Sequence, residues 1–172
     1  MKFTSFVGID ISKKVFDLVL LDQGGKKEGH KQFTNNAKGM EQMESWLQKQ
    51  VALSSVLFCM EHCGIYSLPL CVYLENSHLK YSLQPGLQIK RSMGIQRGKN
   101  DKADALSIAR YAYLYRADIR CSQLPSEAIL RLKELLSYRE RLVKARVSIQ
   151  TASKELSQVW SEHSPICDRK LS

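Results

Sequence analysis

The sequence predicts an α/β fold, in which a mixed sheet is flanked by helices and followed by one long helix. Three observations lead to this fold class. β-rich runs come first, helical and strand-like patterns then alternate up to residue 116, and residues 126–162 contain neither Gly nor Pro. This order of elements is typical of a sheet with both parallel and antiparallel strands, covered by helices.

Three strands are expected near the N-terminus. The first two are short β-rich runs separated by polar residues, and a third, more polar run follows them. The first two runs are closed by Gly24 and Gly25, which indicates a hairpin. The three predicted strands are residues 6–12, 14–22 and 29–35.

Helices and strands are expected to alternate in the next part of the chain. Met40, Met43 and Leu47 recur at helical spacing. Pro85 and Gly86 follow a strand-like run and should close it. The predicted helices are residues 36–50, 65–77 and 101–116, the predicted strands are 54–60 and 79–86, and a basic segment, 87–99, leads into the last helix.

A helical arm is expected after Pro125, so the chain should divide into a main domain, residues 1–120, and an arm, residues 121–172. One apolar position of the arm recurs every seven residues, as in a coiled-coil seam. It is occupied by Leu135, Leu142, Ile149 and Leu156. The second seam position is mostly polar and holds Leu132, Arg139, Arg146, Ser153 and Trp160. The arm should therefore pair imperfectly, or only with a partner such as a second copy.

The charge of the chain favours a polyanionic partner. Its 172 residues include 26 Lys or Arg and 17 Asp or Glu, a formal charge of +9, which suits nucleic acid better than an acidic membrane surface. Within the arm, residues 131–154 carry seven Lys or Arg and two Glu. That basic face could contact phosphate or could simply be solvated. No run approaches the roughly 18 apolar residues of a membrane span, and no signal-peptide pattern is present. A cytoplasmic protein without membrane contact is expected.

The five cysteines are expected to be reduced thiols, since they are odd in number and lack paired C-x-x-C spacing. Cys59, His62 and Cys63 lie close together in the sequence and could act as soft metal ligands. Buried thiols near a strand end are the favoured interpretation.

Acidic residues mark a candidate active site. Asp10 and Glu61 each end an apolar strand, and ligands of open α/β sheets bind at the carboxyl ends of the strands. Asp101 and Asp104, three residues apart, share one face of a predicted helix. If that helix packs beside the same edge, four carboxylates converge. Such a cluster requires cations, and Mg²⁺ suits oxygen ligands while leaving positions open for phosphate.

Basic residues surround the helical aspartates and would hold a polyanion over the metal. They are Lys90, Arg91, Arg97, Lys99 and Lys102. Simpler structural roles remain open at this point. Asp101 and Asp104 could stabilise a helix N-terminus, with Asn100 as an alternative cap. Asp10 could accept hydrogen bonds from loop N–H groups, and Glu61 could be an ordinary surface acid.

Three segments follow one another in the chain, residues 7–22, 60–74 and 84–112. Together they resemble the DEDD-type transposases of bacterial insertion sequences, which are relatives of Piv-type DNA invertases. The match covers about residues 5–116. Its most specific part is K-x-D-x-x-D-A, here Lys99, Asp101, Asp104 and Ala105. The strand motif G-I-D-x-S-K appears as Gly8, Ile9, Asp10, Ser12 and Lys13. Where the family shows E-x-T-G-x-Y, this chain has Glu61, Cys63, Gly64 and Tyr66, so Cys63 replaces the threonine.

The resemblance implies an RNase H-like fold, similar to the RuvC Holliday-junction resolvase, followed by a coiled-coil helix. It implies that Asp10, Glu61, Asp101 and Asp104 form a catalytic tetrad that binds Mg²⁺, with Mn²⁺ as a substitute. Lys13 joins the residues expected to contact nucleic acid. Related transposases also carry a C-terminal domain with a serine nucleophile. No recognisable match to that domain is found before Ser172, and no nucleophile is assigned.

The expected function is that of the metal-binding domain of a bacterial transposase or site-specific recombinase. Its partners would be the DNA of the element ends and target, a guide (bridge) RNA in members that use one, and a second copy through the arm. Such a protein would work in the bacterial cytoplasm, on the nucleoid. Two alternatives are a stand-alone Mg²⁺-dependent nuclease of the resolvase kind and a non-catalytic nucleic-acid-binding product.

Overall fold

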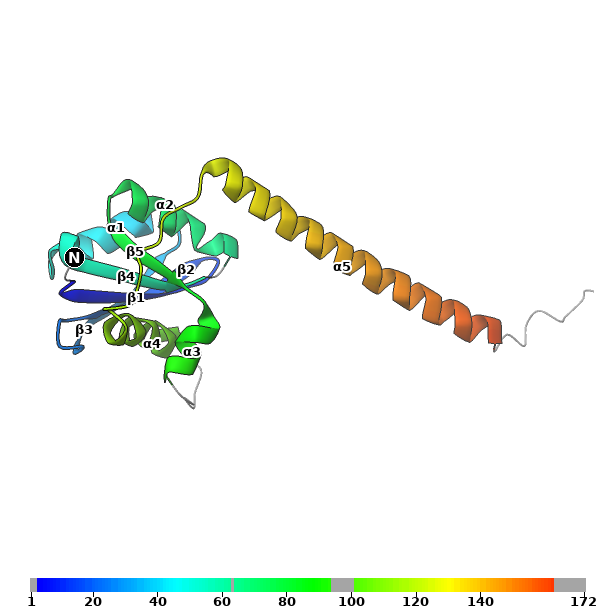
Figure 1. The fold of residues 1–172 in the computed structure, drawn as a ribbon, viewed down its shortest axis with the longest axis horizontal. Helices are drawn as coiled ribbons and strands as arrows, with labels where there is room; N and C mark the ends of the chain where they lie inside the picture. Colours follow the sequence, from blue (N-terminus) through cyan, green and yellow to red (C-terminus); the bar gives the residue numbers. More distant parts are fainter. Residues whose placement is uncertain (1–2, 63, 94–100, 163–172) are drawn as a thin grey trace, which may run out of the picture. The chain divides into compact units, whose positions relative to one another are not determined.

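A computed structural model describes residues 3–62, 64–93 and 101–162 of the chain. The chain forms two compact units, Met1–Leu124 and Pro125–Ser172. The first unit contains a sheet and its covering helices, and the second contains one long helix (Figure 1). No helix within the described residues is both long and apolar enough to span a membrane.

The first unit is built on a five-stranded mixed sheet with the strand order β3-β2-β1-β4-β5. β1 pairs with β2, and β2 with β3, in antiparallel fashion, whereas β1–β4 and β4–β5 are parallel pairs. The strands are β1 (Ser5–Ile11), β2 (Val15–Leu21), β3 (Lys27–Thr34), β4 (Val56–Glu61) and β5 (Lys80–Gln84). The sheet is therefore mixed, as the sequence predicts.

Helices cover both faces of this sheet, with α1 and α2 on one face and α3 and α4 on the other (Figure 1). Their bounds are α1 (Ala37–Gln48), α2 (Leu68–Asn76), α3 (Gly86–Met93) and α4 (Asp101–Leu114), with short 3₁₀ turns η1 (Leu53–Ser55) and η2 (Gly64–Tyr66). Helix α3 falls in the segment that was expected only to lead into the next helix. Helix α2 starts after η2, a little later than predicted.

Alternation along the strands divides the apolar residues between two cores. On β1, Val7 and Ile9 face α1 and α2, whereas Phe6 faces α3 and α4. All three side chains have no exposed surface. Because successive side chains of a strand point to opposite faces, Gly8 and Asp10 share the Phe6 face. The alternation therefore places the side chain of Asp10, at the end of β1, on the face that α3 and α4 cover.

Helix α4 lies unusually close to β1, and Gly8 makes this possible. A Cβ atom added to Gly8 would lie 2.6 Å from the Cα of Ala109 and would overlap the carbonyl oxygen of Ala105. Further back along β1, the ring of Phe6 makes an edge contact with Tyr113, at 5.6 Å between centroids. Since the contact moves from residue 113 to residue 105 as β1 advances, α4 runs antiparallel to β1.

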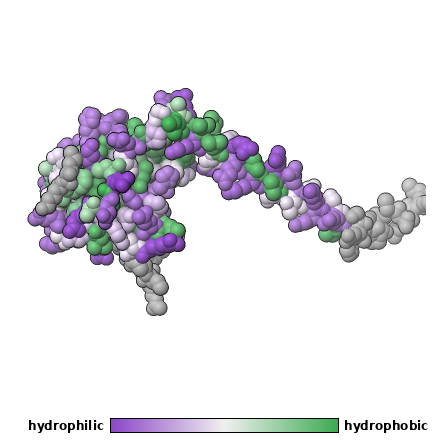
Figure 2. Space-filling view, viewed as in Figure 1, coloured by the Kyte–Doolittle hydropathy of each residue, from purple (hydrophilic) through white to green (hydrophobic). Residues whose placement is uncertain are grey.

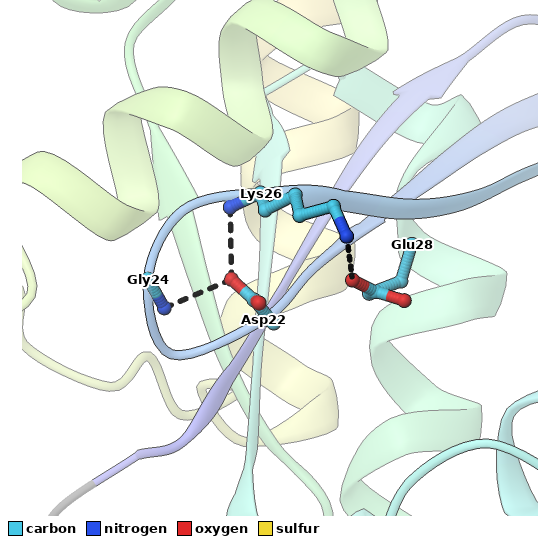
Figure 3. A network of polar contacts seen from close by, with 4 residues as sticks. All are labelled: Asp22, Gly24, Lys26 and Glu28. Carbon is cyan, nitrogen blue, oxygen red and sulfur yellow. Dashed lines mark hydrogen bonds and ion pairs between the residues drawn. The ribbon is translucent and has the colours of Figure 1, made fainter.

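A network of hydrogen bonds fixes the turn between β2 and β3 (Figure 3). The Oδ1 atom of Asp22 accepts hydrogen bonds from the backbone N–H groups of Gly24 and Lys26, both at 2.8 Å. Gly25 has a φ of +78°, which glycine adopts without the strain that a side chain would add. Lys26 also forms an ion pair with Glu28 at 3.8 Å. The turn sets the register of the edge strand β3.

The first unit extends to Leu124 because the segment after α4 returns to the sheet. Ser122 donates its backbone N–H to the carbonyl of Tyr81 at 2.7 Å. The backbone N–H of Leu124 donates to Glu75 in α2 at 3.4 Å. The residues that follow α4 therefore belong structurally to the sheet, and the second unit starts at Pro125.

The second unit is α5 (Glu127–Glu162), the long helix that the sequence predicts. Two ion pairs between residues four apart support it, Glu127–Arg131 at 2.6 Å and Glu140–Lys144 at 2.7 Å. The apolar residues of the predicted seam are exposed, for example Leu135 (65%) and Leu142 (53%). They appear as patches on an otherwise hydrophilic helix (Figure 2).

Replacing Gly8 with Ala should destabilise the first unit by about 3 kcal/mol, because the backbone of α4 blocks the added methyl group. The free energy of unfolding is measured by urea denaturation. Gly24→Ala is the matched control, since the nearest atom to its new Cβ lies 3.4 Å away. Equal stability of the two variants would contradict the close packing of α4 on β1.

Candidate active site

Two of the predicted acids lie side by side at one edge of the sheet. β1 and β4 are parallel neighbours, with Ile9 opposite Met60, and Asp10 and Glu61 are the next residues on these strands. Both are partly buried, and both take part in polar or electrostatic interactions within the protein. Because each follows a residue that faces the α1 and α2 side, both carboxylates belong to the face covered by α3 and α4.

The first turn of α4 lies toward the same place. Asp10 is two residues beyond Gly8, about 7 Å further along the strand. Since α4 runs antiparallel to β1 and passes Gly8 at Ala105 and Ala109, the residues at its start lie toward Asp10. Asp104 belongs to this start and is partly buried. Asp101 is the first residue of α4, and its side chain lies outside the described part of the structure.

Glu61 rests against the start of α3. A Cβ atom added to Gly86, the first residue of α3, would overlap the carboxylate of Glu61. The absence of a side chain at Gly86 therefore leaves room for this carboxylate, which would have to shift if a side chain were present. The start of a helix is the positive end of its dipole, where a carboxylate is stabilised.

A fifth carboxylate, Asp17, lies beside this group and was missed by the sequence analysis. Asp17 is directly opposite Asp10 on β2, on the same face of the sheet, and is only 6% exposed. Its two oxygens accept hydrogen bonds from His30 Nε2 (2.8 Å) and Gln32 Nε2 (2.7 Å), so the bonded nitrogen of His30 carries a proton. An Asp within the apolar run VFDLVLL was the signal that could have revealed it.

The β1–β2 hairpin brings basic residues to this edge. Its turn is closed by the Ser12 N–H, which donates to the Val15 carbonyl at 2.9 Å, and Lys13 is exposed in it. Asn35 ties the turn to the segment that follows Glu61. Its Nδ2 donates to the carbonyls of Ser12 and Tyr66, both at 3.0 Å. No local pattern in the sequence marks this bridging amide.

The remaining predicted basic residues are only partly described. Lys90 and Arg91 are exposed in the last turn of α3. Lys102 belongs to α4, and its side chain lies outside the described residues, as do Arg97 and Lys99 altogether. The described members of the predicted basic set thus lie in the hairpin turn and on α3.

Oxygen donors dominate this edge, and their chemistry fits Mg²⁺ better than a soft metal. Asp10, Glu61 and Asp104 would supply carboxylate oxygens to such an ion. Among the side chains that the structure describes, no group of three or more Asp, Glu, His or Cys residues already has the geometry of a metal site. Asp101, the fourth predicted ligand, is not among those side chains.

A soft-metal site at Cys59, His62 and Cys63 finds no support. Cys59 is fully buried in the core beneath α4, and burial raises the pKa of its thiol to about 12. The thiol therefore stays protonated at neutral pH, whereas the form that binds a metal is the thiolate. His62 is exposed, and Cys63 lies outside the described residues.

A polar cavity of about 240 Å³ opens at the end of β5. Tyr111 of α4 donates a hydrogen bond to Gln84 Oε1 at 3.3 Å beside it. Burial of Tyr111, followed by the influence of Cys59 and Tyr115, raises the pKa of its hydroxyl. The tyrosine therefore acts as a neutral hydrogen-bond donor here. The cavity is lined by Gln84, Gln88, Tyr111, Tyr115, Asp118, Ile119 and Arg120.

The strand order and the helices on both faces define an RNase H-like fold, similar to that of RuvC. The sequence profile of the IS110-type DEDD transposases, described as "Transposase", matches residues 7–160. The chain belongs to this transposase family. The family assignment and the fold agree with the resemblance noted from the motifs.

Two solved structures show the same fold. Thermus thermophilus RuvC in complex with a Holliday junction substrate is 11% identical, with a TM-score of 0.52, covering 69% of this chain and 99% of that chain. A second Thermus thermophilus RuvC structure is 12% identical, with a TM-score of 0.50 and the same coverage. No protein with a curated description matches the sequence.

The two buried thiols should resist alkylation in the native protein. At pH 8, iodoacetamide should modify the exposed Cys121 while Cys59 and Cys71, whose pKa values are raised to about 12 chiefly by burial, stay unmodified. Even at pH 10, only about one in a hundred of the Cys59 or Cys71 thiols is ionised, so both should still react slowly. Mass spectrometry of tryptic peptides gives the extent of modification, with urea-unfolded protein as the control. Modification of Cys59 as fast as Cys121 would contradict its position in the core.

Proposed function

We propose that the first unit is the metal-binding catalytic domain of a DNA transposase or site-specific recombinase from a bacterial insertion sequence. One observation supports this proposal above all. Asp10 and Glu61 end adjacent parallel strands, and α4 packs antiparallel on β1 with its start toward Asp10. Asp101 and Asp104 complete the proposed tetrad. Membership of the transposase family supports it.

The proposed tetrad would hold Mg²⁺, with Mn²⁺ as a substitute. When bound, such ions stabilise the attacking and leaving oxygens at a scissile phosphate. The protein's own part is to position the carboxylates. β1 and β4 fix Asp10 and Glu61, Gly86 gives Glu61 its space, and Gly8 allows α4 to approach. Asp17 adds a buried carboxyl group opposite Asp10.

Basic residues would hold the nucleic acid at this edge by pairing with its phosphates. Lys13 in the hairpin turn and Lys90 and Arg91 on α3 are exposed and available for this role. Arg97, Lys99 and Lys102 are proposed to join them. DNA of the element ends and target is the proposed substrate, supported by the Holliday junction bound to the RuvC of similar fold.

A guide RNA is a further proposed partner, since the chain belongs to a transposase family some of whose members resemble bridge-RNA-guided recombinases. The net charge of +9 is compatible with binding both RNA and DNA. The work would take place in the bacterial cytoplasm, on the nucleoid.

Self-association through α5 is proposed as well. The exposed seam residues Leu135, Leu142, Ile149 and Leu156 recur every seven residues and would be buried by a second copy. The polar residues of the second seam position would keep this pairing weak.

A stand-alone structure-specific nuclease is the second candidate. The observation that favours it is that RuvC matches this chain over 99% of its own length. Mg²⁺-dependent cleavage of branched DNA by the 172-residue chain would support this candidate. Binding of branched DNA without cleavage would support the transposase domain.

Mn²⁺ should bind the wild-type chain, more tightly with branched DNA, and should bind Asp104→Asn at least tenfold more weakly. The mutation removes one carboxylate charge at nearly constant shape. Isothermal titration calorimetry measures both affinities. Asp118→Asn, which removes an exposed acid elsewhere in the same unit, should bind like the wild type. Equal heats for Asp104→Asn and the wild type would exclude Asp104 as a metal ligand.

Leu142→Asn should weaken self-association at least tenfold, because it places an amide at a seam position of α5. Sedimentation velocity over a range of protein concentrations measures the monomer–dimer equilibrium. Gln150→Asn changes an exposed residue outside the seam and should leave the equilibrium unchanged. A wild-type chain that is monomeric at every concentration would contradict pairing through α5.

A further inference from the structure

A groove lies between the edge strand β3 and helix α1, on the sheet face opposite the proposed active site. It has a volume of about 480 Å³. We call it the β3–α1 groove. It is lined by Lys31, Lys38, Glu41, Gln42, Ser45, Trp46 and Lys49. None of them belongs to the proposed tetrad or to the basic residues around it. The groove is therefore a separate feature of the first unit.

Trp46 provides a rigid aromatic surface in this groove. One edge of its indole packs against β3, so that a Cβ atom added to Gly29 would lie 2.8 Å from Trp46 Cη2. The indole also makes an edge contact with Phe33, at 6.1 Å between ring centroids. The rest of the side chain remains partly exposed and lines the groove. Its orientation is thus set by the core while one part stays accessible.

Positive charge surrounds this aromatic surface. The groove contains three lysines and one glutamate. Lys31 Nζ lies 5.4 Å from the centroid of the Phe33 ring, and this cation–π contact helps to hold the ammonium in place. Lys38 and Lys49 are both exposed on α1, about 16 Å apart along the helix. The cations are therefore spread along the groove on either side of the indole.

The nearby acid Glu44 is hydrogen-bonded to residues outside the groove. Its carboxylate accepts hydrogen bonds from the hydroxyl of Tyr73 in α2 and from Gln48, and it is not among the groove residues. Gln42 and Ser45 add polar side chains to the wall instead. A fixed indole, separated lysines and neutral hydrogen-bonding groups suit a ligand that has both planar rings and repeated anionic groups.

We propose that the β3–α1 groove binds a single-stranded polynucleotide, with a base stacked on Trp46 and phosphates paired with Lys31, Lys38 and Lys49. Aromatic stacking combined with a basic track is the general means of holding single strands. The proposal goes beyond the proposed catalytic function, because it assigns a second nucleic-acid site on the opposite face of the sheet. It requires no metal.

Trp46 itself can report the binding. The chain has two tryptophans, Trp46 and Trp160, so Trp160→Phe leaves Trp46 as the only one. Titration of this chain with 20-nucleotide RNA or DNA in EDTA should quench Trp46 fluorescence. Quenching by either polymer supports the proposal, and the ratio of the two affinities identifies the preferred one. Polynucleotide binding seen by anisotropy without any change in Trp46 fluorescence would overturn it.

Charge variants test the groove against non-specific attraction. The triple variant Lys31→Gln, Lys38→Gln and Lys49→Gln should weaken binding at least tenfold and lower the salt slope by about 2, for three lost phosphate contacts. A control triple at exposed lysines outside the groove removes the same charge. It consists of Lys26→Gln, Lys27→Gln and Lys80→Gln. Equal loss in the two triples would overturn a specific groove.

The stacking role is tested separately by anisotropy with labelled single strands. Trp46→Phe should retain most of the affinity, whereas Trp46→Leu should lose about tenfold, because only the aromatic ring can stack on a base. Circular dichroism shows whether each variant is folded. If Trp46→Leu is unfolded, the lysine triples provide the test. Equal affinity of folded Phe and Leu variants would overturn the stacking. Equal quenching by poly-glutamate would show a general anion site and also overturn the proposal.

Single-strand binding at the β3–α1 groove can be tested independently of the proposed metal site. Asp104→Asn should bind single strands at the β3–α1 groove as the wild type does, because the two sites lie on opposite faces of the sheet. Loss of Mn²⁺ binding with intact Trp46 quenching would separate the two sites. Loss of quenching in Asp104→Asn would contradict the groove as a distinct site.

Discussion

The close approach of α4 to β1 at Gly8 is the constraint on which the candidate active site depends. Helix backbone atoms occupy the space that any side chain at this position would need. Because α4 passes this point antiparallel to β1, its N-terminal turn is carried toward Asp10. If α4 stood further off or ran the other way, its first turn would not lie toward Asp10.

The sheet separates two kinds of surface. On the α3 and α4 face, carboxylates gather at the carboxyl ends of β1 and β4, where parallel strands bring successive loops together. On the α1 and α2 face, the β3–α1 groove combines an anchored indole with lysines. Both surfaces depend on the alternation of side chains along the strands, which also builds the two apolar cores. The alternation of side chains along the strands thus determines both the two cores and the residues that line each face.

Buried polar groups in the first unit follow the cost of desolvation. Asp17 is kept in the protein interior by two side-chain donors from β3, as a buried carboxylate requires. Cys59 has no such charged state to maintain, and burial keeps its thiol protonated. The hydrogen-bonded carboxylate of Asp17 and the protonated thiol of Cys59 are therefore two responses to burial in the same unit.

The sequence by itself determined the order of the five strands and of every helix except α3, the mixed sheet, the long helix and the strand-end positions of Asp10 and Glu61. These depend on local patterns of apolar spacing, turn residues and the absence of Gly and Pro. Only the tertiary structure decided that Asp17 lies opposite Asp10, that Asn35 links the hairpin to the segment after Glu61, and that Trp46 and Lys31 share a groove. Strand register and helix packing create these neighbours. Both arise from contacts between residues far apart in the chain, which local spacing does not encode.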